Sequence, residues 1–362
     1  MNATLVQYFG LRFLVTLFAV VAGVIALIAL IDYVETMRRY SDLPDLSAWY
    51  VAKTSLFRVP QLAERILPFC FLIGTMSCYL GLSRRLELVI ARAAGMSAWQ
   101  FTAPAVVVAL LVGVLATTVY NPLAANLHER SKRLEAELSG PRELSLQSAG
   151  SGFWIRQRSV DGFSIINAGA TREQGMQLGV VTAFTFDNNG HFLARIEARS
   201  AKLEAGYWQL DDARIFAPGS PTSERSSYRL PTNLTFEQVR ETFSTPETVP
   251  FWQLPLYIRL AENAGLAAAG YRLQYQKLLS QPFTLAAMVL LAAAFSLQMF
   301  RFGGVQKMVF IVLTAGFSLY VITKVTDDLG TAELMHPVIA AWLPAVLGGL
   351  TGFVALLYRE DG

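Results

Sequence analysis

The segment SRRLELVIARAAGMSAWQ, residues Ser83–Gln100, is a short polar stretch between two long apolar runs. Within it, apolar residues recur with the three- and four-residue spacings that predict an amphipathic helix. These residues are Leu86, Val89, Ile90 and Ala93. A basic amphipathic helix between two membrane spans either lies in the headgroup layer or is a coupling helix held by a cytoplasmic motor protein. The rest of the chain decides between these two interpretations.

The composition indicates an integral membrane protein. Of the 362 residues 53% are hydrophobic and only 16% are charged, and the mean hydropathy is +0.40, a combination rare in soluble domains. The net charge of +3 is small and evenly spread, so nucleic acid is not an expected partner.

Uncharged apolar runs occur on both sides of a long polar region, and all except the short fifth run reach membrane-crossing length. They cover residues 13–31, 66–82, 101–120, 278–300, 308–323 and 337–358. We therefore predict a mixed membrane protein with six transmembrane α-helices arranged three plus three. The first run has no small-residue cleavage pattern, so we expect a retained anchor and no removed signal peptide.

Charge in the connecting loops predicts the orientation of the spans. One set of loops is rich in basic residues and has a single acid, Glu87; the opposite set mixes both signs. The basic residues of the first set are Arg84, Arg85, Arg92, Arg301 and Lys307. By the positive-inside rule this set and both termini are cytoplasmic. Residues 83–100 then lie inside, and residues 121–277 lie outside.

The outer region changes to alternating periodicity from Gly152 onward. In residues 192–199 the apolar side chains Phe192, Ala194, Ile196 and Ala198 alternate with Leu193, Arg195, Glu197 and Arg199. Asn189-Gly190 before them favours a hairpin turn. We predict an all-β domain, either sandwich, jelly roll or open barrel, with a helical extension before it and an interfacial helix over residues 254–279 after it. The expected domains are 1–139, with three spans and the coupling helix 83–100, then 140–250 and 251–362.

The sequence contains none of several motifs that would indicate an enzyme. There is no G-x-x-x-x-G-K-[ST] phosphate loop, so we do not expect this chain to hydrolyse ATP, and there is no G-x-S-x-G or HExxH motif. Its three histidines are scattered, and we expect no metal and no cofactor. The near absence of charge inside the spans argues against an ion-driven pump and favours an external energy source.

The order of these features resembles the permeases of the lipopolysaccharide-export ABC transporter, the LptF/LptG family. The resemblance covers essentially the whole chain and rests on the three-plus-three spans, the inserted β domain, and the segments Leu86-Glu87-Leu88-Val89 and Ala94-Gly95-Met96-Ser97. Further matching pieces are Val59-Pro60, Pro68, Gly81-Leu82, Gly152-Phe153-Trp154 and Trp342-Leu343-Pro344. The coupling segment and Val59-Pro60 place the chain nearer to the LptG branch than to the LptF branch.

The resemblance implies a transporter subunit in the inner membrane of a Gram-negative bacterium. It implies a heterodimer with the paralogous permease LptF, a cytoplasmic dimer of the ATPase LptB, and the single-span protein LptC. Lipopolysaccharide would pass from the membrane to a periplasmic bridge formed by LptA. By the same resemblance, the outer domain is expected to be jelly-roll-like.

Two groups of candidate site residues follow from the resemblance. Glu87 matches the acidic residue of the family's coupling helix, although Leu86 replaces the preceding serine, and Arg85 and Arg92 accompany it as ATPase-coupling candidates. The second group is basic and is expected at the outer ends of spans one and three, where it would bind the lipid A phosphates. Its members are Arg38, Arg39, Arg130, Lys132 and Arg133. In both groups the alternative is an ordinary solvated or snorkelling charge.

Two other classes of function remain open on the sequence alone. A membrane-anchored transferase acting on lipid or glycan would require converging carboxylates or a metal cluster near the outer face, and no such cluster stands out. A structural anchor for a β domain would require only one span. Six spans favour transport.

Overall fold

The computed structural model describes residues 3–40, 48–143, 153–159, 162–172, 176–187, 190–219, 221–234, 246–263, 268–296 and 305–360. Within these residues, six helices are long and apolar enough to cross a membrane, which confirms the six-span prediction. The helices are α1 (Ala3–Arg39), α2 (Ala48–Arg84), α3 (Glu87–Ala93), α4 (Ala98–Leu115), α5 (Asn121–Glu143), α7 (Leu254–Asn263), α8 (Ala269–Ser296), α9 (Val305–Thr331) and α10 (Pro337–Glu360). A π-helix (Ala116–Tyr120) joins α4 to α5, and a 3-10 turn (Pro246–Thr248) precedes α7.

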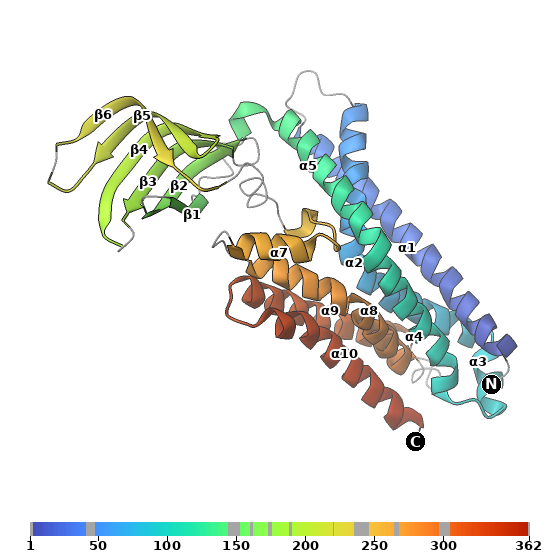
Figure 1. Cartoon of the computed structure of the whole chain (residues 1–362). Helices are drawn as coiled ribbons and strands as arrows, with labels where there is room; N and C mark the ends of the chain where they lie inside the picture. Colours follow the sequence, from blue (N-terminus) through green and yellow to red (C-terminus); the bar gives the residue numbers. More distant parts are fainter. Residues whose placement is uncertain are drawn as a thin grey trace. The chain divides into compact units, whose positions relative to one another are not determined.

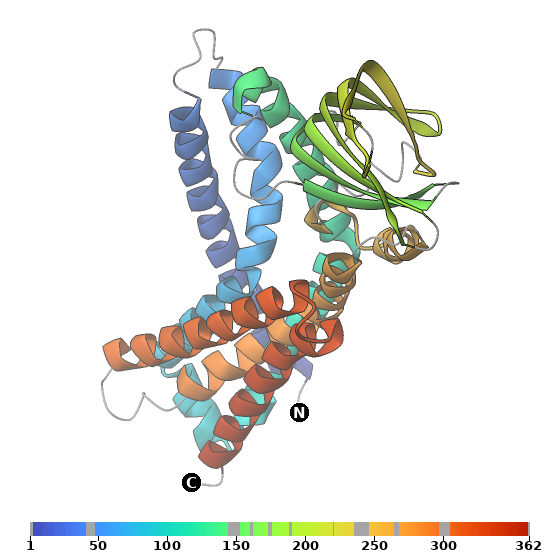
Figure 2. The ribbon, with the colours of Figure 1, turned by 90° about the vertical axis from the view of Figure 1, so that its left-hand side faces the viewer.

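The two ends of the helix bundle are distinct. Figure 1 shows the N-terminal end of α1, the C-terminal end of α10 and α3 at one end of the bundle, and Figure 2 agrees. We call this the α3 end, and the opposite end the far end. Because the termini share one end, the number of crossings is even, as six spans require.

Span three does not stop at the predicted Asn121-Pro122 break. Proline removes a helical hydrogen bond and crowds the carbonyl four residues earlier, here that of Thr118. The helix widens into the π-helix at this point and continues as α5. The Thr118 carbonyl accepts a hydrogen bond of 3.0 Å from the Trp252 indole N–H instead. A partner distant in sequence therefore lets the helix pass the proline.

The predicted interfacial helix over residues 254–279 is divided in the structure. Helix α7 ends at Asn263 and α8 begins at Ala269, and residues 264–267 lie outside the described residues. The fourth span is therefore longer than its uncharged run, because α8 starts nine residues before the predicted start at Leu278.

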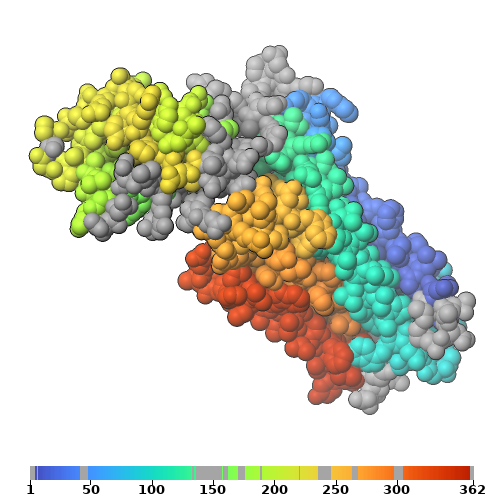
Figure 3. Space-filling model, viewed as in Figure 1, coloured from blue at the N-terminus to red at the C-terminus, as the bar shows by residue number. Residues whose placement is uncertain are grey.

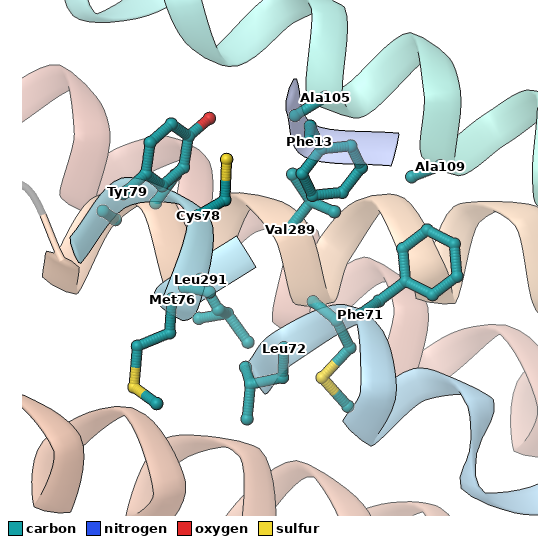
Figure 4. Packing of buried hydrophobic residues seen from close by; sticks show 14 of the residues in the cluster. Phe13, Phe71, Leu72, Met76, Cys78, Tyr79, Ala105, Ala109, Val289 and Leu291 are labelled. Atoms are coloured by element: carbon teal, nitrogen blue, oxygen red, sulfur yellow. The ribbon is translucent and has the colours of Figure 1, made fainter. Parts of the chain in front are cut away.

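The core of the bundle is built around α8. This helix packs against α2, α4, α9 and α10, and Figure 4 shows Val289 of α8 near Phe13 of α1, Phe71 of α2 and Ala109 of α4. All four side chains are buried. Within a membrane, close van der Waals packing stabilises such contacts between helices, and small residues such as Ala109 let the helices approach closely.

One glycine marks a close approach of the backbones of two spans. A Cβ atom added at Gly113 of α4 would lie 2.5 Å from the Cα atom of Pro282 in α8. Real Cβ atoms do not approach a backbone atom so closely, so this contact requires glycine. By contrast, a Cβ atom added at Gly81 of α2 would meet nothing within 4 Å.

The region between spans three and four contains a six-stranded antiparallel sheet, which confirms the predicted inserted all-β domain. The strands are β1 (Phe153–Ser159), β2 (Gly162–Arg172), β3 (Gln177–Phe186), β4 (Phe192–Glu204), β5 (Tyr207–Phe216) and β6 (Ser223–Pro231). Each strand pairs with the next along the chain, and the sheet is strongly curved (Figures 1 and 2). This is a meander, and the described strands contain no Greek-key crossing of the kind that defines a jelly roll.

In three strands of the curved sheet, the alternation of buried and exposed side chains is interrupted. In β3 the buried positions change from even to odd numbers at Val180, whose φ is 51°, and in β5 they change at Asp212, whose φ is 52°. In β4 the buried positions change between Ala198 and Ala201. Each shift keeps apolar side chains on the concave core around Trp208. The predicted simple alternation therefore holds only up to Ala198.

A buried polar network stabilises this core. The Gln157 amide oxygen accepts hydrogen bonds from the Trp208 indole N–H at 2.9 Å and from the Thr232 hydroxyl at 2.7 Å. The Gln157 amide nitrogen donates to the Ser164 hydroxyl at 2.9 Å. Each of these polar groups is buried with a partner, as a stable core requires.

The chain forms two compact units. One comprises Met1–Lys132, Pro250–Trp252 and Ala269–Gly362, and the other comprises Arg133–Val249 and Gln253–Ala268. The first contains the membrane-crossing helices with α3. The second contains the sheet and α7.

Candidate functional site

Helix α3 has defined ends that hold it between two spans. Leu86 adopts a left-handed conformation with φ of 62° at its start, and its amide N–H donates to the Ser83 carbonyl at 2.8 Å. Gly95, with φ of 85°, ends the turn that follows α3, and Ser97 with Gln100 forms a capping box at the start of α4. The predicted amphipathic helix is therefore confirmed.

The exposed face of α3 is apolar. Leu88 is 5% exposed and belongs to the bundle core, whereas Leu86, Val89 and Ile90 are 61%, 51% and 66% exposed. We call these three exposed residues the α3 stripe. An exposed apolar stripe with basic neighbours fits either a protein partner or a headgroup layer.

Glu87 is held in place by the first span. Its carboxylate accepts a hydrogen bond of 2.8 Å from the Tyr8 hydroxyl of α1. The predicted coupling acid therefore links the short helix to α1. Tyr8 had no place among the predicted site residues, because its 79-residue separation from Glu87 leaves no pattern in the sequence.

The two predicted basic companions of Glu87 are both exposed. Arg85 lies in the turn between α2 and α3, and Arg92 lies in the last turn of α3. The Arg92 guanidinium lies 6.0 Å from the centre of the Phe101 ring, within the range of a cation–π contact. These side chains border the α3 stripe with positive charge.

Part of the second predicted group lies at the far end of α1. Arg38 and Arg39 are exposed in the last turn of this helix, where cations interact favourably with the helix dipole. Arg39 lies 3.8 Å from the Glu35 carboxylate, and both side chains are about half exposed. Such an exposed pair is weak, so it leaves Arg39 able to exchange partners.

The rest of that group lies on α5. Arg130 is exposed and Lys132 is partly buried, and the side chain of Arg133 lies outside the described residues. The neighbouring Ser131 hydroxyl donates to the Thr54 carbonyl of α2 at 3.0 Å. Helix α2 therefore has a direct hydrogen bond to α5 near these basic residues. Arg301 of the predicted cytoplasmic loops also lies outside the described residues.

A buried ion pair joins α1 to α2 and was not predicted. The Arg58 side chain donates to Asp32 from Nε at 2.9 Å, and its terminal nitrogen lies 2.8 Å from the same oxygen, Oδ1. That nitrogen also donates to the Thr36 hydroxyl at 2.7 Å. The Asp32 and Arg58 side chains are only 10% and 16% exposed. An acid and a base 26 residues apart in one predicted loop carry no sequence signal that they pair.

An apolar cavity of about 200 Å³ lies between α1, α2, α4 and the π-helix. Val21 and Ile25 of α1, Leu67 of α2 and Leu115 of α4 are among its lining residues. Glu64 also lines it, and its carboxylate accepts a hydrogen bond of 3.0 Å from the Asn121 amide. The cavity therefore offers hydrocarbon surface, with its one acidic side chain already paired.

The spans differ greatly in how far they are covered. Only 6% of the most apolar 18-residue stretch of α1 is buried, and 22% of that of α9, against 67% for α8. Figure 3 shows α1 in dark blue along one edge of the helices. The exposed aromatic residues Phe18, Phe310 and Phe317 lie on α1 and α9. Among the described spans, these two helices are the least covered by the rest of the bundle.

The architecture defines a class of protein. Two groups of three membrane-crossing helices, an inserted β domain, and an exposed short helix between the second and third spans are the parts of a multi-pass membrane protein. The profile of the family described as lipopolysaccharide export system permease LptF/LptG matches residues 7–359. The chain belongs to this family of inner-membrane transporter subunits.

Individual relatives agree with this assignment. The chain is similar to the lipopolysaccharide export system permease protein LptG of Escherichia coli (strain K12), with 23% identity over 347 residues and 94% of each chain covered. It is also similar to the protein of the same name from Haemophilus influenzae, with 22% identity over 356 residues and 95% of each chain covered.

Proposed function

We propose that this chain is the permease subunit of an ABC transporter that extracts lipopolysaccharide from the inner membrane and passes it to a periplasmic bridge. A separate cytoplasmic ATPase supplies the energy. Membership of the permease family supports this function, and the observation that carries the mechanism is the α3 stripe, whose three residues are each more than half exposed.

The α3 stripe is the docking surface for the ATPase in this proposal. Apolar residues at the centre of an interface with charged residues around them are typical of protein contacts. Arg85 and Arg92 supply the charged border, and Glu87 transmits movement to α1 through Tyr8. This requires α3 and both termini to be cytoplasmic, and the basic loop residues support that orientation.

The uncovered faces of α1 and α9 suit contacts with other membrane helices and with lipid. The proposed neighbours are the paralogous permease LptF and the single-span LptC, with LptB as the ATPase dimer and LptA as the bridge. Arg38, Arg39, Arg130, Lys132 and Arg133 are proposed to meet the lipid A phosphates, because Arg binds phosphate through charge-assisted, often bidentate, hydrogen bonds.

Reconstitution tests the function directly. The chain is purified with its co-expressed permease and ATPase partners, placed in liposomes containing lipopolysaccharide, and supplied with the bridge protein as acceptor. The expected result is ATP-dependent transfer of lipopolysaccharide to the acceptor. A complex that assembles and hydrolyses ATP but transfers no lipopolysaccharide above the level without ATP would contradict the proposal.

A further inference from the structure

The ion pair between Asp32 and Arg58 is incompletely satisfied. Both guanidinium nitrogens within reach converge on Oδ1 of Asp32, while Oδ2 is buried and has no hydrogen-bond partner among the described residues. A fork-to-fork pair would use both oxygens. A buried carboxylate oxygen without a donor carries a desolvation cost that the pair does not recover. The geometry is therefore poor for a purely structural ion pair.

The position of this pair suits an amphipathic ligand. Asp32 follows Ile25 by seven residues, which places both on the same face of α1, about two turns or 10 Å apart. Ile25 lines the apolar cavity between α1, α2 and α4. A guanidinium thus lies about two turns from a space lined by hydrocarbon. A lipid phosphate with an attached acyl chain has this combination of charge and apolar surface.

We propose that Arg58 is a phosphate-binding residue that Asp32 masks when no substrate is bound. A headgroup phosphate at the far end of α1 takes the guanidinium from Asp32, and this removes the ion pair that holds α1 to α2. Phosphate offers more acceptor oxygens than the single one that Asp32 uses. The exchange leaves the Asp32 carboxylate without Arg58, so the far end of α1 must move to bring this carboxylate to water. This inference rests on the proposed function. It adds a contact in which Arg58 changes its partner from Asp32 to a phosphate when substrate binds.

The exchange gives α1 a means of responding to the substrate. Near the α3 end Phe13 and Leu17 are buried against α2 and its neighbours, whereas Leu27, Leu30 and Ile31 near the far end are more than half exposed. The far end of α1 therefore exposes an apolar face. The Asp32–Arg58 ion pair and the hydrogen bond from Arg58 to Thr36 attach this end to α2. Their loss frees this end of the helix.

Equilibrium binding to the purified transporter complex tests the masking. Labelled lipopolysaccharide carrying its lipid A phosphates is titrated against wild type, Arg58→Gln, Asp32→Asn and the double variant. Arg58→Gln should weaken binding about tenfold, the loss expected for one charge-assisted hydrogen bond. Asp32→Asn should strengthen binding severalfold, because it releases the guanidinium. The double variant should match Arg58→Gln, since Asp32 acts only through Arg58.

The dephosphorylated lipid and a phospholipid serve as controls. All four proteins should bind lipopolysaccharide without its lipid A phosphates equally. Phosphatidylglycerol binding should be independent of Arg58; equal dependence would assign the site to bilayer phospholipid and overturn the substrate assignment. Arg58→Lys, which keeps the charge without the fork, should lie between wild type and Arg58→Gln, and it covers the case in which the glutamine variant does not fold.

A structural ion pair gives the opposite pattern. If Asp32→Asn weakens binding or leaves it unchanged in a complex of normal thermal stability, the masking is wrong. A wild-type complex that binds no lipopolysaccharide would instead contradict the proposed function itself. The two failures are therefore distinguishable in one experiment.

Discussion

The Tyr8 hydroxyl of α1 donates a 2.8 Å hydrogen bond to the Glu87 carboxylate of α3. Tyr8 lies near one end of α1, and Asp32, which pairs with Arg58, lies 24 residues further along the same helix. At 1.5 Å per residue these positions are about 36 Å apart. A single continuous helix thus connects the proposed ATPase contact to the proposed substrate contact. A movement of α3 has a direct mechanical route to the far end of α1.

Tyr8→Phe removes this hydrogen bond and keeps the aromatic ring. We expect the ATPase to remain bound, because the α3 stripe is unchanged, but lipopolysaccharide released per ATP should fall by about twofold to tenfold, within the range found for residues that couple two sites. The measurement is transfer and hydrolysis in the same proteoliposomes. A Tyr33→Phe variant on the same helix is the matched control. An unchanged ratio for Tyr8→Phe would show that this bond does not carry coupling.

Gly113→Ala should destabilise the bundle by about 1 to 3 kcal/mol, the usual cost of overpacking. The added methyl group would lie 2.5 Å from the Pro282 Cα atom, and a backbone atom cannot move away as a flexible side chain would. Gly81→Ala is the matched control, because its methyl group meets nothing within 4 Å and alanine favours a helix. The midpoint of thermal unfolding in detergent is measured for both variants and for wild type. Equal midpoints for both variants would contradict the close contact between α4 and α8.

Val180→Gly should stabilise the β domain by about 1 kcal/mol. Valine at a φ of 51° has a left-handed conformation that costs about 1 to 2 kcal/mol, and its side chain is 72% exposed, so little packing is lost. Leu193→Gly, at an exposed strand position without a positive φ, should destabilise the domain. Hydrogen exchange of the β3 and β4 amides in the full chain measures both. Faster amide exchange in Val180→Gly than in wild type would show that the backbone at Val180 is not strained.

Much of the fold follows from local patterns in the sequence. Uncharged runs of sufficient length predict the six spans, and the three- and four-residue spacing in residues 86–93 predicts α3, because each pattern reflects one element and its immediate surroundings. The hairpin between β3 and β4 likewise follows from the turn residues near Gly190.

The remaining features depend on partners far apart in the chain. The continuity of span three past Pro122 depends on Trp252, 134 residues from Thr118. The shift in alternation at Asp212 has no glycine to indicate it. In each case contacts between distant parts of the chain determine the feature, and no local sequence pattern predicts it.

The most direct test of the account is retention of the ATPase by a variant of the α3 stripe. Val89→Glu/Ile90→Glu places two charges on the exposed face and leaves the buried Leu88 intact. Val305→Glu, at the exposed first residue of α9, is the control, because the span order places it on the same side of the membrane as α3. We measure the ATPase that co-purifies with each tagged permease and the ATP hydrolysis of each complex. The account predicts at least a tenfold loss of bound ATPase for the α3 variant, with wild-type retention for Val305→Glu; full retention and normal hydrolysis in the α3 variant would contradict it.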